Sequence, residues 1–113
     1  MSAESKQIDL LQGTLNMMIL RVLRPAPANG YEIARAIELR SDELLQVEHG
    51  SLYPALRRLE ARGFIAAEWR TSPTNRRARY YKLTPAGRKE VLREHSRWQT
   101  LVGAITRVMR PAE

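Results

Sequence analysis

The sequence predicts a mainly α-helical domain with one small β-hairpin and a long C-terminal helix. Apolar residues recur with the period of an amphipathic helix up to residue 59, and between residues 65 and 83 the period becomes that of β-strands. Residues 53–89, which span this change, hold ten Lys/Arg against two acids, a net charge of +8 in a chain whose total is +7. A length of 113 residues suits one compact domain.

Two helices are expected first. The apolar stripe of the first comprises Leu15, Met18, Ile19, Val22 and Leu23. This helix should end at Arg24, because the prolines at positions 25 and 27 cannot continue it. Asn29 should cap the second helix and form a capping box with Glu32. The second helix is expected to end near Ser41.

Gly50 and Ser51 are expected to open a third helix, with Ser51 as its N-cap and Pro54 in its first turn. The side predicted to be buried comprises Leu52, Leu56 and Leu59. The opposite side is predicted to comprise Ser51, Pro54, Ala55, Arg58, Arg62 and, at its edge, Arg57. Gly63 should end the helix in the left-handed conformation, with Phe64 packing just after it.

The following hairpin joins two strands through the polar turn 72–75. One strand places Ile65, Ala67 and Trp69 on one face, and the other does the same with Tyr81 and Leu83. Trp69 is expected to pack beneath the hairpin. Tyr80 and Tyr81 alternate, so one of them should be buried and the other exposed.

Thr84 and Pro85 should start a last helix that nothing interrupts before Pro111. At about 1.5 Å per residue it would be longer than a domain of this size can cover, so part of it needs another partner. A heptad seam is expected to pair it with a second subunit through Val91, His95, Trp98, Leu101, Val102, Ile105 and Met109. The side of the stripe with Leu92 and Leu101 is expected to cover its own domain. These patterns divide the chain into residues 10–84 and a C-terminal dimerisation helix, 85–110.

The basic segment is typical of a winged helix-turn-helix, in which a helix and a hairpin carry arginines to both sides of a DNA groove. No acid lies between Trp69 and Lys89, and crowded like charges favour an anionic partner. The residues expected to contact DNA are Ser51, Tyr53, Pro54, Arg57, Arg58, Arg62, Asn75, Arg76, Arg77 and Arg79. The fold class expected is therefore a winged helix-turn-helix followed by a long dimerisation helix.

Four segments form a more specific combination. They are GYEI at residues 30–33, GSLYPALRRLE at 50–60, GFI at 63–65 and RYYKLTPAG at 79–87. Together they resemble the PadR family of bacterial transcriptional regulators, in its short form with a single terminal helix. The resemblance implies a dimeric repressor, with Tyr53 and its helix on DNA and the hairpin arginines on the adjacent backbone or minor groove. It does not imply a particular inducer.

Several other functions find little support in the sequence. There is no cysteine, and His49 and His95 have no carboxylate at metal-ligand spacing, so no metal site or cofactor is expected. Ser51 lacks an accompanying base, so no catalytic constellation is present and an enzyme is not expected. The longest apolar stretch is too short to span a membrane, and the polar first nine residues lack a signal-peptide core. A cytoplasmic protein is expected.

Two alternatives remain open. One is a winged-helix module that binds protein through its apolar helix. The other is an RNA-binding protein, which should expose aromatic side chains for base stacking, whereas the basic segment has few. Trp98 is a candidate plate for a small planar hydrophobic effector at the dimer centre. The operator, the regulated genes, the effector and the sign of regulation do not follow from the sequence.

Overall fold

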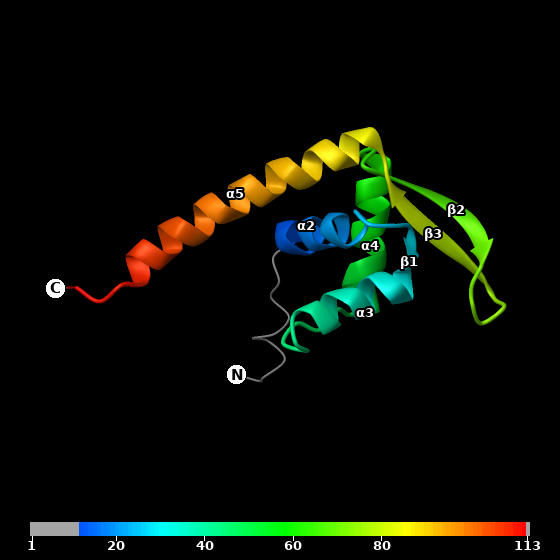
Figure 1. The fold of residues 1–113 in the computed structure, drawn as a ribbon, viewed down its shortest axis with the longest axis horizontal. Helices are drawn as coiled ribbons and strands as arrows, with labels where there is room; N and C mark the ends of the chain where they lie inside the picture. The colour runs from blue at the N-terminus through cyan, green and yellow to red at the C-terminus, as the bar shows by residue number, and fades with distance from the viewer. Residues whose placement is uncertain (1–11, 113) are drawn as a thin grey trace.

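A computed structural model describes residues 12–112 of the chain, and Figure 1 shows the arrangement of the elements. In this range the elements are α2 (Gln12–Val22), β1 (Ala28–Asn29), α3 (Gly30–Arg40), α4 (His49–Ala61), β2 (Ile65–Thr71), β3 (Arg77–Leu83) and α5 (Pro85–Met109). The described part is mainly helical with a small antiparallel sheet, so the predicted fold class is confirmed.

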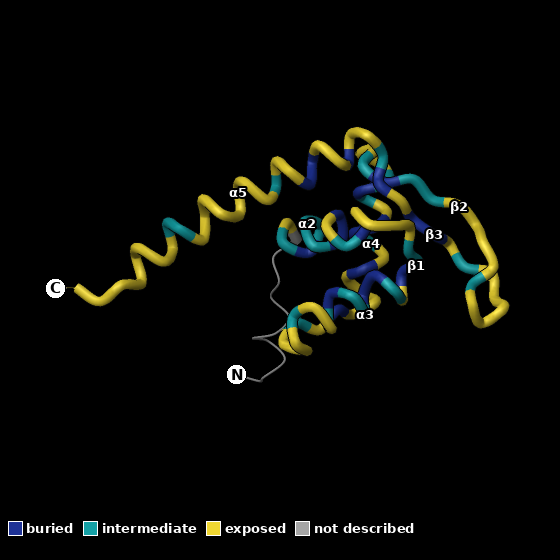
Figure 2. The backbone as a smooth tube through the Cα atoms, viewed as in Figure 1, coloured by how far each residue is buried: buried dark blue, intermediate teal, exposed yellow. Residues whose placement is uncertain are grey.

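The core lies where α2, α3 and α4 meet (Figure 2). Its largest fully buried side chains are Ile19, Leu20, Leu23, Ile33, Leu52, Leu56, Leu59 and Ile65. They come from the three helical stripes, from Leu23 just past the end of α2, and from the first residue of β2. Burying three such stripes against one another removes most of their apolar area from water, which stabilises the helix arrangement.

The start of α3 has the predicted capping box. The side-chain oxygen of Asn29 accepts a hydrogen bond from the Glu32 amide at 2.8 Å. The Glu32 carboxylate in turn accepts one from the Asn29 amide at 3.0 Å. Two amides that a helix N-terminus leaves unpaired are therefore satisfied locally.

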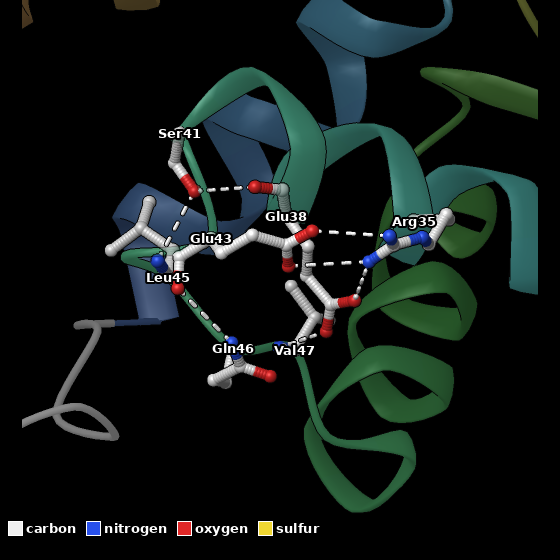
Figure 3. Close-up of polar contacts among 7 residues, drawn as sticks. All are labelled: Arg35, Glu38, Ser41, Glu43, Leu45, Gln46 and Val47. Atoms are coloured by element: carbon white, nitrogen blue, oxygen red, sulfur yellow. Dashed lines mark hydrogen bonds and ion pairs between the residues drawn. The ribbon is translucent and has the colours of Figure 1, made fainter.

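The connection between α3 and α4 is tied back onto α3 by polar side chains (Figure 3). The Ser41 hydroxyl donates to the Glu38 carbonyl oxygen at 3.0 Å and accepts from the Leu45 amide at 3.1 Å. The Glu38 carboxylate accepts from the Val47 amide at 3.1 Å and pairs with Arg35 at 3.4 Å. These contacts set the path by which the chain enters α4.

Helix α4 begins earlier than predicted. It starts at His49, and its N-cap Glu48 makes no side-chain capping bond. Ser51 is therefore not the N-cap, and Pro54 lies inside the helix beyond the first turn. The Ser51 amide already donates to the Glu48 carbonyl at 3.0 Å, which closes the first turn. Because proline has no N–H, the bond that would run from position 54 to the Gly50 carbonyl is missing.

The end of α4 is as predicted. Gly63 has φ of +81°, in the left-handed region that favours glycine. The Phe64 amide donates to the Leu59 carbonyl and the Gly63 amide to the Glu60 carbonyl, each at 3.0 Å. This pair of bonds is a Schellman motif, which turns the chain sharply into β2.

The sheet has the strand order β1-β3-β2, with both pairings antiparallel. The two-residue strand β1 was not predicted, and it places Ala28 opposite Tyr81 and Asn29 opposite Tyr80. Both tyrosines are buried, so the prediction that one of them is exposed is wrong. Strand β1 covers the outer edge of β3 at these residues, and the Arg70 guanidinium lies 5.5 Å from the centre of the Tyr80 ring.

Trp69 does not pack beneath the hairpin as predicted, since 59% of its surface is exposed. Trp69 lies on the face of the hairpin that is turned toward the core, which we call the core face. The cross-strand pairs on this face are Ile65–Leu83, Ala67–Tyr81, Trp69–Arg79 and Thr71–Arg77. Figure 1 shows the reason: β2 and β3 extend well beyond the helices. The first pair on this face therefore has a core beneath it, whereas Trp69 lies past the edge of that core.

Helix α5 is anchored where α4 ends. The Thr84 hydroxyl accepts a hydrogen bond from the Gly87 amide at 3.0 Å and donates to the Gly63 carbonyl at 2.6 Å. The Thr84 amide donates to the Phe64 carbonyl at 3.1 Å. A Cβ atom on Gly87 would lie 2.0 Å from that same carbonyl oxygen, so only glycine fits this joint.

Only the first part of α5 belongs to the body of the domain, and its distal part extends away from the helices (Figures 1 and 2). Val91, predicted in the dimer seam, is instead 2% exposed and lies in its own core. Leu92 and Leu101, predicted to cover their own domain, are 60% and 48% exposed. Adjacent helical residues point about 100° apart, so burying Val91 turns Leu92 toward solvent.

Candidate nucleic-acid interface

The outer face of α4 carries most of the predicted contact residues. Ser51, Tyr53, Arg57 and Arg62 are exposed, and Pro54 and Arg58 are partly buried. Ala55, predicted on this face, is fully buried. The reason is that α4 packs on α2, α3 and β2, which makes its buried stripe wider than three leucines.

Tyr53 is held against the start of α3. A Cβ atom on Gly30 would lie 2.7 Å from the Tyr53 hydroxyl oxygen, so the ring can lie here only because residue 30 is glycine. On its other side Tyr53 meets the His49 ring edge-on, with centroids 5.6 Å apart and planes at 89°. Sequence reasoning missed the contact between Gly30 and Tyr53, although both residues lie in the segments that carry the family resemblance.

The tip of the hairpin is a tight turn that presents arginines. The Ser72 amide donates to the Arg76 carbonyl at 2.7 Å, and the Asn75 amide donates to the Ser72 carbonyl at 2.8 Å. Asn75 has φ of +61°, which asparagine tolerates better than most residues. Asn75, Arg76 and Arg77 are all exposed at this tip.

Tertiary structure brings a carboxylate to one arginine of the hairpin. Glu60 on α4 pairs with Arg79 on β3 at 2.8 Å, so the prediction of an uncompensated cluster does not hold for Arg79. The Arg77 guanidinium lies 5.4 Å from the centre of the Trp69 ring, within cation–π range. Among the described residues, no carboxylate lies within ion-pair distance of Arg57, Arg62, Arg76 or Arg77.

A surface groove of about 820 Å³ separates the hairpin from the start of α3 and from α4. Its aromatic walls are Tyr31 from α3, Tyr53 from α4 and Trp69 from β2, and all three side chains are exposed. Its basic wall comprises Arg76, Arg77 and Arg79. More aromatic surface is exposed here than the sequence indicated.

Two side chains of the hairpin, one on β2 and one on β3, have pKa values that differ from the ordinary ones. Burial raises the pKa of the Tyr81 phenol, and the nearby positive charge of Arg79 partly opposes this effect. On the other face of the hairpin, a hydrogen bond from Arg70 lowers the pKa of the Glu68 carboxyl. The bond from Arg70 Nε to Glu68 Oε1 is 2.9 Å long. Arg70 is therefore matched by an acid on the face that lies away from the groove.

A second exposed surface runs along α5. Its large apolar residues are Trp98, Leu101, Val102, Ile105, Val108 and Met109, and His95 is exposed with them. At the N-terminal end of this surface, a groove of about 400 Å³ lies between α2 and α5. This groove is lined by Gly13, Thr14, Met17, Glu94, Arg97, Trp98 and Leu101. We refer to the exposed apolar residues from Trp98 to Met109 as the α5 stripe.

Residues 12–112 contain neither a cluster of metal-ligating side chains nor a membrane-spanning helix. No group of three or more His, Cys, Asp or Glu side chains in this range could hold a metal ion. None of the helices in the same range is both long enough and apolar enough to cross a membrane.

The hairpin of β2 and β3 with its connecting turn is a basic wing beside the three-helix core. The core, this wing and the exposed face of α4 define a winged helix-turn-helix protein of the transcriptional-regulator class. The model of the transcriptional regulator PadR-like family matches residues 19–93. The chain belongs to this family, whose members are transcriptional regulators rather than enzymes.

Solved structures and one curated relative agree with this assignment. The chain is similar to a transcriptional regulator from Clostridium thermocellum, with a TM-score of 0.81, 30% identity and coverage of 91% of this chain and 97% of that one. It is also similar to a PadR family regulator from Eggerthella lenta, with a TM-score of 0.77, 29% identity and coverage of 96% and 93%. The negative transcriptional regulator PadR of Bacillus subtilis is 29% identical over 77 residues, which are 68% of this chain and 42% of that protein.

Proposed function

We propose that the protein is a homodimeric repressor that binds an inverted-repeat DNA operator and is released by a signal still to be identified. The observation that carries this proposal is that α4 and the wing both present exposed arginines, and that those of the wing line the groove between the two elements. Like charges held so close are stabilised when a polyanion lies between them. The name of the Bacillus subtilis relative, a negative regulator, supports repression.

Helix α4 would enter the major groove and the wing would follow the adjacent backbone or minor groove. The contacts proposed on α4 are Ser51, Tyr53, Pro54, Arg57, Arg58 and Arg62, and those on the wing are Asn75, Arg76, Arg77 and Arg79. Small residues at the start of α4 leave room for base edges, and the arginines behind them reach phosphates or guanine. Arg79, which is already paired with Glu60, is expected to contribute less than Arg76 or Arg77.

The α5 stripe supports the homodimer. Its side chains are exposed, although Trp98 and Leu101 border α2, and they continue along a helix that leaves the domain (Figure 2). A second copy of α5 would bury them, together with His95, in one symmetric interface. Dimer symmetry would then place two α4 helices at a fixed separation, which must match half-sites about 34–36 Å apart.

The groove beside Trp98 is the place where we propose that an effector acts. Trp98 lines this groove together with Leu101 and residues of α2, and its indole is partly exposed. A small planar hydrophobic molecule stacked there would lie against α2 and the α5 stripe together. A ligand that favours a different crossing angle between the α5 helices of the two subunits would change the separation of the two α4 helices. The dimer would then release the operator.

A salt titration of DNA binding tests the proposal. We expect affinity for a duplex containing the upstream region of the protein's own gene to fall steeply with salt, as for proteins that neutralise about 6–10 phosphates. Replacing Arg76 and Arg77 together by alanine should weaken binding to every duplex and flatten the salt slope. The matched control is the double alanine variant of Arg107 and Arg110, which removes the same charge from the far end of α5.

The outcomes separate the candidate functions. Equal losses in both double variants would show that overall charge, not the wing, governs binding. Tighter binding to single-stranded RNA than to duplex DNA would favour the RNA alternative, to which the exposed aromatic side chains of the groove lend some support. If the protein binds neither duplex DNA nor RNA, the remaining candidate function is that of a winged-helix module that binds protein.

A further inference from the structure

The core face of the wing continues outward past the core. Ile65 lies at its inner end and is buried, whereas Trp69 and Arg77 lie further along the same face and are exposed. Trp69 lies on the core face but has no core beneath it, so much of its indole ring is exposed to water. Exposed aromatic surface of this kind is typical of a binding site.

Two other elements turn aromatic side chains toward the same groove. Tyr31, in the first turn of α3, is 68% exposed and lines the groove with Trp69. Tyr53 reaches it from α4 and packs closely on Gly30. Three elements therefore place three rings around one open space, and no described segment fills it.

The charges around the groove identify its occupant. Arg76 and Arg77 line it without a carboxylate partner among the described residues. Glu32 is the acid on its lining, and its carboxylate accepts a hydrogen bond from the Asn29 amide. A groove with a positive wall and aromatic walls suits a chain of phosphates joined by deoxyriboses, since aromatic rings pack on the C–H faces of sugars while arginines pair with phosphates.

We propose that the sugar–phosphate backbone of the bound DNA duplex occupies this groove, with the Trp69 ring packed on a deoxyribose and the Tyr31 hydroxyl donating to a phosphate. This inference rests on the proposed function and adds two positioning residues, Tyr31 and Trp69, that lie outside the predicted contact set. Backbone contacts set orientation and carry little sequence information. Both residues should therefore affect affinity for all duplexes alike.

Tryptophan fluorescence tests the position of Trp69 directly. The chain has two tryptophans, so a Trp98→Phe variant leaves Trp69 as its single reporter. Adding a mixed-sequence duplex oligonucleotide at low salt should change the emission of this variant, with saturation at the stoichiometry of binding. A Trp69→Phe variant, which reports on Trp98 alone, should show a smaller change. An unchanged Trp69 signal at saturating DNA would overturn the inference.

Affinity measurements test the two contacts separately. Tyr31→Phe and Trp69→Ala should each weaken duplex binding by about tenfold, the loss expected when one charge-assisted hydrogen bond or one packed ring is removed. Trp69→Phe should restore part of the affinity. Tyr80→Phe, which removes a hydroxyl on the other face of the wing, is the matched control and should bind like the parent.

The controls keep this inference separate from the proposed function. Tyr31 and Trp69 are exposed, so their variants should unfold at the temperature of the parent protein. If both variants bind DNA as tightly as the parent while the Arg76 and Arg77 double variant does not, the backbone does not occupy the groove and the proposed function stands. If the parent protein itself binds no duplex, both proposals fail together.

Discussion

Arg79 on β3 and Glu60 on α4 form an ion pair, with 2.8 Å between the guanidinium nitrogen and the carboxylate oxygen. The two residues are 19 positions apart, and their pairing links the wing directly to the helix proposed to enter the major groove. Both side chains are partly exposed, so the pair contributes about 0–1 kcal/mol to stability. Its larger consequence is electrostatic, because it compensates the charge of one arginine that lines the groove.

Replacing Glu60 by glutamine should strengthen non-specific DNA binding. The change removes one negative charge per subunit beside the groove and releases Arg79, so affinity at low salt should rise about threefold and the salt slope should steepen by up to about one unit per subunit. Salt titrations with a mixed-sequence duplex measure both effects. Glu68→Gln, whose partner Arg70 lies on the other face of the wing, is the control. Equal gains in the two variants would mean that net charge alone is responsible.

Gly87→Ala should destabilise the protein. The new methyl group would lie 2.0 Å from the Phe64 carbonyl oxygen, so the joint between α4 and α5 must open, at a cost of about 1–3 kcal/mol or more. Denaturant unfolding measures the loss. Gly50→Ala adds the same methyl group where no atom beyond the adjoining backbone of its own helix lies within 4 Å, and its stability should equal or exceed that of the parent. A Gly87→Ala protein as stable as the parent would contradict the close contact seen here.

Ile105→Asp should dissociate the proposed dimer. Ile105 lies within the α5 stripe, and an unpaired carboxylate buried in the interface would cost several kcal/mol. Light scattering should report a monomer, and operator affinity should fall because each half-site is then bound alone. Thr100→Asp introduces the same charge on the opposite side of α5 and should remain dimeric. If both variants remain dimeric, the dimer interface lies elsewhere.

A planar hydrophobic effector should act through Trp98. Titrating such compounds should quench tryptophan fluorescence in the parent, and the quenching should disappear in Trp98→Ala, in which Trp69 remains. The groove beside Trp98 has a volume of about 400 Å³, within the range of small-molecule sites. Quenching that persists unchanged in the variant would exclude Trp98 as the binding plate.

Much of the fold follows from local patterns. The capping box of Asn29 and Glu32 and the Schellman turn at Gly63 depend on neighbouring residues only, and both form as predicted. The helical stripes and the start of α5 at Thr84 also follow from spacing within one segment. The start of α4 was misplaced because Glu48 begins that helix without a side-chain cap, and only such a cap is visible in sequence.

The candidate site was predicted in part. Exposed arginines lie on α4 and at the wing tip, where the charge pattern put them, and those of the wing line the groove. The same pattern did not include Tyr31, which lies outside the basic segment and reaches the groove only because α3 begins beside the wing. Nor did it reveal the contact of Gly30 with Tyr53, since a glycine carries no charge or apolar signal of its own.

By itself the sequence determined which segments are helical, where the chain turns and where positive charge accumulates, because propensity, capping and charge are properties of short segments. Tertiary structure alone decided which positions on a periodic face are covered. Val91 is buried and Leu92 exposed because α5 meets the body along one line, and Trp69 is exposed because the hairpin outreaches the helices. Coverage depends on where elements end in space relative to one another, and no single segment encodes that relation.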